Sequence, residues 1–377
     1  MSYLMIEGGR PLHGRITVQC AKNSVLPILA ATLLAGDVCR ITACPRLSDV
    51  DTASDILRHL GCAVCWELSY PGGCELGPRP IDLHLTALRT LGAEINEVGG
   101  SLLCHADHMQ GADIVLTLPS VGATENAILA ACGAEGVTVI SNAAREPEIV
   151  DLQDFLQKLG ATVYGAGTSS ITVCGGKTLH GGTHRCIGDR IAAATYLCAA
   201  AASGGRITLD GVDYRHLATV TTALHQAGCH LQCGKDTITL KSEGRLRAVA
   251  PVRTSPYPGF PTDAQAPLMA ALLCSTGTTM FVENMFESRY RHVPELMRMG
   301  ADIRLEGRVA VICGVPKLHG AIVHTADLRG GAALVIAALQ TCSGSTQIHD
   351  IHHIQRGYQD IAGDLTALGA SIHTADV

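Results

Sequence analysis

The chain has 377 residues, a formal net charge of −6 and an apolar content of 47%, which together indicate a globular protein with full-sized cores in two or more domains. The acidic balance disfavours nucleic-acid binding, and no uncharged apolar run reaches the ~18 residues that would span a membrane. No secretory signal precedes the 16 cysteines, so we expect reduced thiols in a cytoplasmic protein. Cys62 and Cys65 form a CxxC without a second pair, and we expect neither metal nor cofactor.

The first candidate site is Ala21-Lys22-Asn23-Ser24, which opens an apolar helix after the N-terminal strands. A helix N-terminus that Asn or Ser caps, with a lysine beside it, is a ready anion site. A surface lysine next to a cap is an equally good interpretation of the same residues.

The next candidate is the loop Ser69–His84. Pro71, Gly72 and Gly73 break regular structure just before Cys74, and Arg79 stands between two prolines. A thiol near a fixed cation has a lowered pKa and becomes reactive. The alternative is that Cys74, as one of 16 cysteines, is an ordinary small apolar residue.

A helix end followed by a strand recurs along the chain, each time around a glycine that fits the left-handed position after a helix. These glycines are Gly61, Gly92, Gly160, Gly228, Gly300 and Gly369, at intervals of 31, 68, 68, 72 and 69. Long apolar helices are expected at 24–35, 124–135, 191–202, 264–275 and 331–341. The first interval is therefore about 38 residues short of the ~69-residue period, and one apolar helix is missing between Val64 and Tyr70.

The repeating unit is clearest between residues 113 and 174. It predicts a strand at 113–120, a helix at 124–135, a strand at 137–142, a helix at 149–159 and strands at 162–164 and 170–174. Six such βαβαββ units predict an α/β protein of two three-unit domains, with the apolar helices inside the sheets and the first pair of units truncated.

Charged residues cluster where later repeat helices begin. Asp263 precedes the fourth apolar helix and is either a helix cap or a base, Asp327 and Arg329 begin the fifth, and Arg356 follows a strand of the same unit. Each residue alone has an ordinary structural interpretation. Together with Lys22 they place cations and acids at repeat-equivalent helix starts.

These stretches closely resemble the enolpyruvyl transferase family, and within it the UDP-N-acetylglucosamine 1-carboxyvinyltransferases. The matching segments are 21–27, 71–74, 77–84, 120–126, 142–151, 260–263, 292–296 and 327–329. The resemblance covers the whole chain except the gap near 62–70. It implies a two-domain inside-out α/β barrel, with a first domain at 22–187 and a second at 1–21 plus 188–377.

The resemblance also implies the reaction. Phosphoenolpyruvate and UDP-N-acetylglucosamine would give the enolpyruvyl ether and phosphate, the first committed step of peptidoglycan synthesis. Lys22, Arg79, Arg329 and Arg356 would bind the phosphate and carboxylate of phosphoenolpyruvate. Cys74 would be the general acid at the enol carbon, and Asp263 would accept the proton of the sugar hydroxyl. Lys22 and Arg356 are placed with the catalytic residues.

The remaining substrate-binding residues are assigned by motif match. Leu118 and Pro119 depart from one common family pattern, which has a lysine there. The set comprises Asn23, Arg79, Pro80, Ile81, Asp82, Leu83, Leu118, Pro119, Ser120, Val121 and Asp327, together with a backbone contact from Met285.

The gap near 62–70 removes a strand, a helix and a strand from the family pattern. We expect a cavity, a bared apolar surface on the helix at 124–135 and impaired activity. The alternative function is that of a truncated homologue that only binds the UDP-sugar. A fold-mate acting on RNA ends is disfavoured by the acidic charge.

Overall fold

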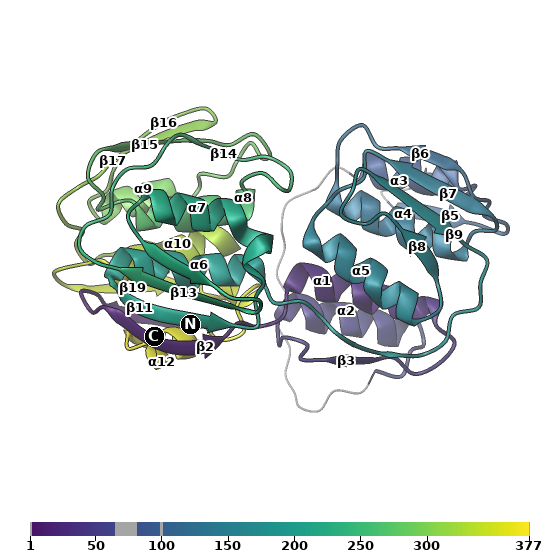
Figure 1. Ribbon diagram of the computed structural model, residues 1–377, viewed down its shortest axis with the longest axis horizontal. Helices are drawn as coiled ribbons and strands as arrows, with labels where there is room; N and C mark the ends of the chain where they lie inside the picture. The colour runs from purple at the N-terminus through teal and green to yellow at the C-terminus, as the bar shows by residue number, and fades with distance from the viewer. Residues whose placement is uncertain (1, 65–80, 99–100, 377) are drawn as a thin grey trace.

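The computed structural model describes residues 2–64, 81–98 and 101–376, which form two bodies side by side (Figure 1). The first half contains the elements from α1 to β10. The second half contains β1, β2 and the elements from α6 onward. Among the described residues, no helix is both long enough and apolar enough to cross a membrane.

The second half has three four-stranded sheets with one shared plan, in which a parallel pair is extended by two antiparallel strands. Their orders are β12-β13-β11-β2, β14-β15-β17-β16 and β18-β19-β1-β20. The strands are β1 (Ser2–Glu7), β2 (Leu12–Thr17), β11 (Gly205–Asp210), β12 (His230–Cys233), β13 (Thr237–Ser242), β14 (Val252–Arg253), β15 (Thr278–Val282), β16 (Asp302–Glu306), β17 (Val309–Cys313), β18 (Ile322–His324), β19 (Ser345–His349) and β20 (Ser371–Asp376).

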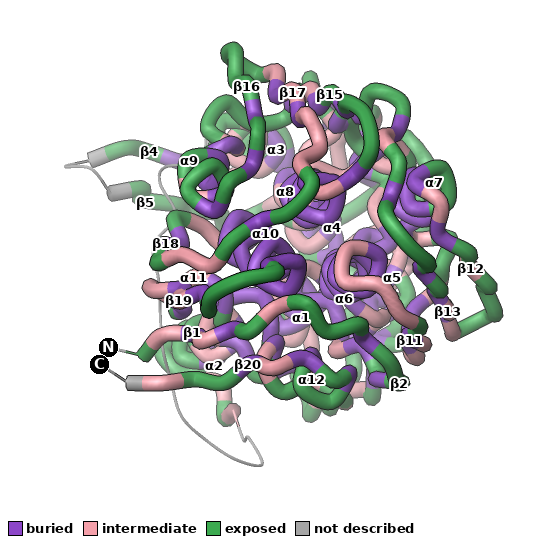
Figure 2. The backbone as a smooth tube through the Cα atoms, turned by 90° about the vertical axis from the view of Figure 1, so that its left-hand side faces the viewer, coloured by how far each residue is buried: buried purple, intermediate pink, exposed green. Residues whose placement is uncertain are grey.

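Three apolar helices fill the space between these sheets. They are α6 (Arg190–Ser203), α8 (Thr262–Ala271) and α10 (Leu328–Leu339), and each contacts the other two. Figure 2 shows them buried. Their many alanines let the helix axes approach closely, since small side chains shorten the packing distance. The outer helices are η2 (Tyr214–Leu217), α7 (Ala218–Gln226), α9 (Val293–Arg298), α11 (His352–Gln355) and α12 (Ile361–Ala367).

Within its described residues, the first half has one complete sheet, β6-β7-β9-β8, and two partial ones. In the complete sheet, Ile140 lies opposite Ile171 and both are fully buried, as expected for inward-facing strand positions. The strands are β3 (Arg40–Thr42), β4 (Glu94–Val98), β5 (Ser101–His105), β6 (Asp113–Val115), β7 (Val137–Ser141), β8 (Thr162–Tyr164), β9 (Ser170–Cys174) and β10 (Thr183–Arg185). The helices are α1 (Lys22–Ala31), η1 (Thr32–Leu34), α2 (Ser48–His59), α3 (Asp82–Thr90), α4 (Val121–Gly133) and α5 (Pro147–Lys158).

The two partial sheets are complementary fragments of the shared plan. The pair β10-β3 is parallel and, in the described chain, lacks the antiparallel strands, whereas β4-β5 is antiparallel and lacks the parallel pair. The described residues therefore contain the start of one unit, with its parallel pair, followed by the end of the next, with its antiparallel pair. This arrangement confirms the truncated repeat pair that the glycine spacing predicts, although part of the junction lies outside the described residues.

The six repeat glycines confirm the predicted helix ends. Each has a positive φ, between 92° and 107°, a region that a Cβ penalises. The chain therefore turns the same way after α2, α3, α5, α7, α9 and α12.

Helix α4 carries the surface that the gap was expected to bare. Asn126 and Gly133 are exposed, and Leu129 and Ala130 are half-buried, although the helix is apolar along its length. By contrast, Leu334, Val335 and Ile336 of α10 have no exposed area. The exposed residues are Asn126 and Gly133 and not large apolar side chains, so the bared apolar surface stays a prediction.

The described part of the chain crosses between the halves twice. Strand β2 pairs with β11, and β10 pairs with β3. At the crossing the Ala21 N–H donates to the Ile187 carbonyl at 2.8 Å, and the Asp189 N–H donates to the Gln19 carbonyl at 2.8 Å. One core runs from Cys20 to Cys186, and the other joins Leu4–Val18 to Ala192–Ile372. The predicted domain limits lie beside this division and stay a prediction.

Candidate active site

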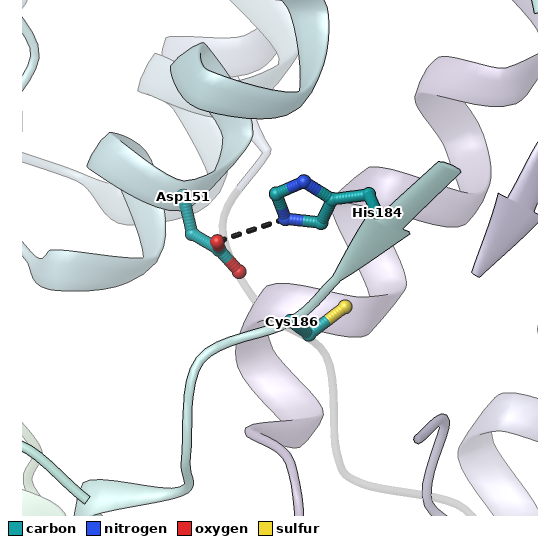
Figure 3. Close-up of side chains that lie close together, drawn as sticks. All are labelled: Asp151, His184 and Cys186. Atoms are coloured by element: carbon teal, nitrogen blue, oxygen red, sulfur yellow. Dashed lines mark hydrogen bonds and ion pairs between the residues drawn. The ribbon is translucent and has the colours of Figure 1, made fainter. Parts of the chain in front are cut away.

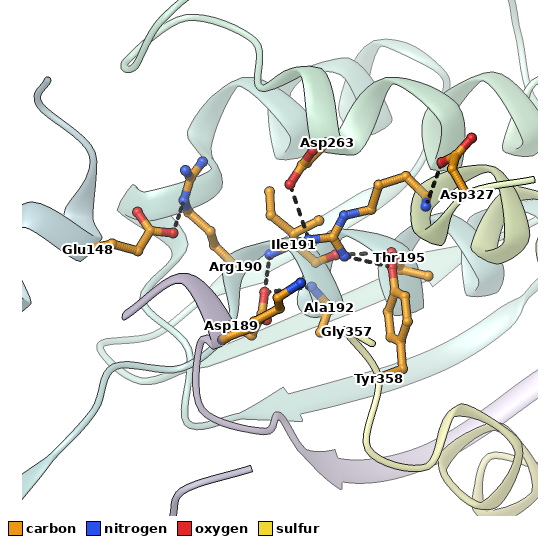
Figure 4. Close-up of polar contacts among 12 residues, drawn as sticks. Glu148, Asp189, Arg190, Ile191, Ala192, Thr195, Asp263, Asp327, Gly357 and Tyr358 are labelled. Atoms are coloured by element: carbon orange, nitrogen blue, oxygen red, sulfur yellow. Dashed lines mark hydrogen bonds and ion pairs between the residues drawn. The ribbon is translucent and has the colours of Figure 1, made fainter. Parts of the chain in front are cut away.

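Helix N-termini from both halves meet near the crossing, so their unpaired backbone N–H groups add to the positive charge there. Lys22 begins α1, and Arg329 lies in the first turn of α10. Asp189 caps α6 by accepting from the N–H groups of Ile191 and Ala192, and its other oxygen lies 3.4 Å from the Lys22 N–H. Figure 4 shows Asp189, Asp263 and Tyr358 around this junction.

Lys22 and Arg356 share one carboxylate, that of Asp49. The Lys22 ammonium lies 2.5 Å from Asp49 Oδ2, and Arg356 donates from Nε at 3.0 Å and from Nη2 at 3.1 Å. Asp49 belongs to α2 in the first half and Arg356 follows α11 in the second, so this contact joins the halves. Burial would raise the pKa of Asp49, but its hydrogen bonds to Arg356 and Lys22 outweigh burial and lower it.

Asp263 is held by two arginines. Its Oδ2 accepts from Arg329 Nη2 at 3.1 Å, and its Oδ1 is paired with Arg289. Burial would raise the pKa of Asp263, but the charges of Arg329 and Arg289 hold it far below its usual value. The carboxylate is therefore a weak base as long as both guanidinium groups stay on it. The capping alternative is wrong, because Pro261 is the N-cap of α8 and Asp263 points to the arginines instead.

Arg329 is nearly buried and fixed on several sides. Its Nη1 donates to the Tyr358 hydroxyl at 3.3 Å, and its guanidinium lies over the Tyr358 ring at 5.7 Å. The Tyr358 hydroxyl in turn lies 2.7 Å from Thr195 Oγ1 on α6. Asp327 is the N-cap of α10 and accepts from the N–H groups of Arg329 and Gly330. The contact of Arg329 with Asp263 therefore depends on the complete core of the second half.

A second buried ion pair joins the halves at α5 and α6. Arg190 Nε lies 2.9 Å from Glu148 Oε1, and both side chains are almost fully buried (Figure 4). Removing one partner would leave an uncompensated buried charge. This pair therefore helps to fix the two halves against each other.

The residues predicted for the nucleotide side form a second group, in the first half. Ile81 is exposed at the start of α3, where Asp82 and Leu83 form the first turn, and Leu118 is exposed before α4. The Ser120 hydroxyl caps α4 by accepting from the Ala123 N–H at 3.4 Å, and Pro119 and Val121 flank it half-buried. Helix α3 packs on α4. The structure thus brings 81–83 near 118–121.

Five other predicted residues have separate outcomes. Asn23 is half-buried on α1, and Met285 is partly exposed, with its backbone N–H already donating to Glu283 Oε1 at 2.8 Å. Cys74, Arg79 and Pro80 lie outside the described residues.

The predicted cap of α1 is wrong. Ala21 is the N-cap and makes no side-chain bond, while the hydroxyl of Ser24 donates to Asp151. Asp151, His184 and Cys186 form a buried group of metal-ligand type (Figure 3). However, His184 Nε2 lies 2.9 Å from Asp151 Oδ1, Lys158 Nζ lies 2.9 Å from His184 Nδ1, and Asp151 accepts the Ile187 N–H. Because these polar atoms already have partners, the group ties α5 to β10 and α1.

Three residues of the junction were missed by the sequence analysis, namely Asp49, Asp189 and Arg289. Asp189 had a readable signal, because Asp189-Arg190 opens the apolar helix at 191–202 much as Asp327-Leu328-Arg329 opens the last one. No sequence pattern marks Asp49 or Arg289, because their partners Arg356 and Asp263 are distant in sequence.

Comparison with known proteins places this arrangement among enolpyruvyl transferases. The sequence profile described as EPSP synthase (3-phosphoshikimate 1-carboxyvinyltransferase) matches residues 6–68 and 62–365. The chain is 44% identical over 414 positions to UDP-N-acetylglucosamine 1-carboxyvinyltransferase 2 of Caldanaerobacter subterraneus subsp. tengcongensis, covering 99% of both chains. It is 40% identical over 420 positions to UDP-N-acetylglucosamine 1-carboxyvinyltransferase 1 of Clostridium acetobutylicum, covering 100% of both.

Solved structures agree on the fold. The enolpyruvyl transferase NikO from Streptomyces tendae superposes with a TM-score of 0.88 at 22% identity, covering 100% of this chain and 99% of that chain. The EPSP synthase of Acinetobacter baumannii gives 0.77 at 18% identity, with 100% of each chain covered. At these identities the likeness concerns the fold alone.

The comparisons also locate the difference in length. The chain spans 99% of the Caldanaerobacter relative, so it is not a fragment of that protein. However, that alignment has 414 positions and this chain has 377 residues, so at least 37 positions of the relative have no counterpart here. The two profile matches meet at 62–68, where the glycine spacing predicts the gap. The missing residues are therefore internal.

Proposed function

This chain belongs to the UDP-N-acetylglucosamine 1-carboxyvinyltransferase family, and we propose that it transfers the enolpyruvyl group of phosphoenolpyruvate to the 3-hydroxyl of UDP-N-acetylglucosamine and releases phosphate. The observation that carries this proposal is the end-to-end identity of 40–44% with relatives of that name. We further propose a cytoplasmic enzyme that acts at the first committed step of peptidoglycan synthesis, and so in cell-wall formation during growth and division. Its two domains would have the limits 22–187 and 1–21 plus 188–377.

The geometry at the junction is suited to binding a substrate with two anionic groups. Phosphoenolpyruvate carries a phosphate and a carboxylate, and both need charge-assisted donors. Lys22, Arg329 and Arg356 are buried cations at the junction, where Lys22 lies close enough to both arginines for their charges to lower its pKa. Three cations are thereby available to one anion at the meeting point of helix N-termini.

In the proposed reaction the sugar hydroxyl adds to the central carbon of phosphoenolpyruvate while the terminal carbon gains a proton. Loss of phosphate and of one proton from that carbon then restores the double bond. Asp263 is our proposed acceptor of the hydroxyl proton. The hydrogen bond from Arg329 lowers the basicity of the Asp263 carboxylate. A substrate anion that draws the Arg329 guanidinium toward itself would therefore make Asp263 a stronger base.

The other proposed roles rest on motif match. Cys74 would donate the proton to the terminal carbon, and Arg79 with Pro80 would complete the nucleotide side formed by 81–83 and 118–121. Asn23 and Asp327 would contact the substrates from α1 and α10, and Met285 would do so through its backbone carbonyl, since its N–H is taken by Glu283.

Phosphate release tests the proposal directly. The purified chain is mixed with both substrates, and inorganic phosphate is followed over time, with each substrate omitted in turn. We expect release that needs both substrates, disappears in Cys74→Ser and persists in Cys104→Ser, a matched change at an exposed thiol. No release with both substrates present would contradict the proposed function. The turnover number also measures the impairment expected from the internal gap.

A further inference from the structure

We propose that Asp49 is a positioning residue for the substrate anion, because its carboxylate holds Lys22 and Arg356, one from each half, so that their remaining donors converge on a single phosphate or carboxylate group. For phosphoenolpyruvate as the ligand, this inference rests on the proposed function. Asp49 belongs to none of the sequence motifs that carry the family resemblance.

The contact geometry leaves donors available. Arg356 uses Nε and Nη2 on the two Asp49 oxygens, which fixes the guanidinium plane and leaves Nη1 outside this pair. Lys22 has three ammonium hydrogens and uses one direction toward Asp49 Oδ2. The Asp49 side chain is only 17% exposed, so water screens the arrangement little. One carboxylate therefore orients two cations without consuming their capacity to bind an anion.

The charges around Lys22 explain why this acid is needed. Lys22 faces Asp49 from α2, Arg329 from α10 and Arg356 after α11, and its backbone N–H faces Asp189. Burial lowers the pKa of Lys22, the two arginines lower it further, and the hydrogen bond and charge of Asp49 oppose them. Without Asp49, Lys22 would lose its proton at a lower pH. Anion binding needs the ammonium, so the affinity for phosphate would then fall at a lower pH than in the unchanged protein.

Calorimetric titration with inorganic phosphate, and separately with phosphoenolpyruvate, between pH 6 and 9 tests this inference. We expect Asp49→Asn to weaken phosphate binding by about tenfold or more at pH 8, which is the effect of losing one charge-assisted interaction. As the pH rises, we expect this variant to lose phosphate binding at a lower pH than the unchanged protein does. Asp51→Asn is the matched control on the same helix, since Asp51 pairs with no cation in the described structure. Circular dichroism verifies that both variants are folded.

Asp49→Glu provides an independent check. It keeps the carboxylate one methylene further out, so we expect it to retain the pH dependence of the unchanged protein and to lose less affinity than Asp49→Asn. Equal affinity and equal pH dependence in Asp49→Asn and Asp51→Asn would overturn the inference, as would an unchanged protein that binds no phosphate. The binding measurement is separate from turnover. Asp49-dependent phosphate binding without phosphate release from phosphoenolpyruvate would support this inference and overturn the proposed function.

Discussion

The two halves are built from the same unit, but the second half is complete and the first is not. In the second half, α6, α8 and α10 enclose one another, and all have apolar sequences. In the first half, α1 and α4 have equally apolar sequences, yet Ala30 of α1 and Asn126 of α4 are exposed. The difference shows that an apolar helix in this architecture is buried only by its neighbours, because the sheet alone covers one side of it.

The same contrast appears in the site. Arg329 and Asp263 both come from the complete half, where α6, α8 and α10 hold their positions. The first half contributes Lys22 on α1 and Asp49 on α2; these helices contact each other, and α1 also contacts α5. The contacts of Lys22 and Arg356 with Asp49 involve no residue of α4 or of the partial sheets. The cation cluster can therefore persist beside an incomplete core.

The largest expected effect comes from a matched pair of core truncations. Ile336 of α10 and Leu129 of α4 each lie nine residues after their helix N-cap. Ile336→Ala should destabilise the second half by roughly 2–5 kcal/mol, because the cavity cannot collapse among packed helices. Leu129→Ala should cost the first half less, roughly 1–2 kcal/mol, because the Leu129 side chain is already partly exposed. Urea unfolding monitored separately for each half measures both changes, and equal costs would contradict the comparison.

The next effect concerns local opening. Native-state hydrogen exchange should show amides at 38–110 exchanging about thirtyfold faster or more than those at 190–377, a difference of about 2 kcal/mol in opening free energy. The cause is the smaller buried apolar area around the partial sheets. Uniform protection across both halves would show that the partial sheets are as stable as the complete ones.

The smallest effect is a pH dependence in the first half. Glu125 of α4 has a buried Oε1 without a partner, and burial, Glu148 and Glu146 raise its pKa well above the usual value. Because the folded pKa is above the unfolded one, the stabilising contribution is complete below about pH 4.3 and is lost as the pH rises from there toward the folded pKa. Glu125→Gln should therefore raise stability by roughly 1 kcal/mol at pH 8 and leave it unchanged near pH 4.

Thermal unfolding of Glu125→Gln at several pH values measures this effect, with Glu135→Gln as the control at an exposed position just after the same helix. A gain that does not grow with pH would show that Glu125 is not held neutral. In the second half, by contrast, the buried acid Asp263 is ionised between two arginines.

Much of the fold was predictable from sequence because it depends on local features. Gly61 and Gly369 ended helices as predicted, since a positive φ favours glycine wherever the chain is. Asp327 at the start of α10 was also predictable, because the cap is made within three residues. The predicted cap of α1 failed because Ser24 found a partner in Asp151, 127 residues away.

The site was predictable only in part, and for the same reason. Lys22, Asp263, Arg329 and Arg356 could be selected from their motifs. Their pairing with Asp49 and Arg289 could not, because the Asp49–Arg356 contact spans 307 residues of sequence. A partner of that kind exists only once both halves have folded and met.

The paired crossing between the halves has a consequence for how the protein could have changed over time. Residues 19–21 and 187–189 lie hydrogen-bonded side by side, so the first half is inserted in the second through two adjacent connecting segments. A loss or gain of residues inside such an insert leaves the strand order of its host unaltered. A large internal deletion can therefore be tolerated in the first half, while the three complete sheets of the second half are kept.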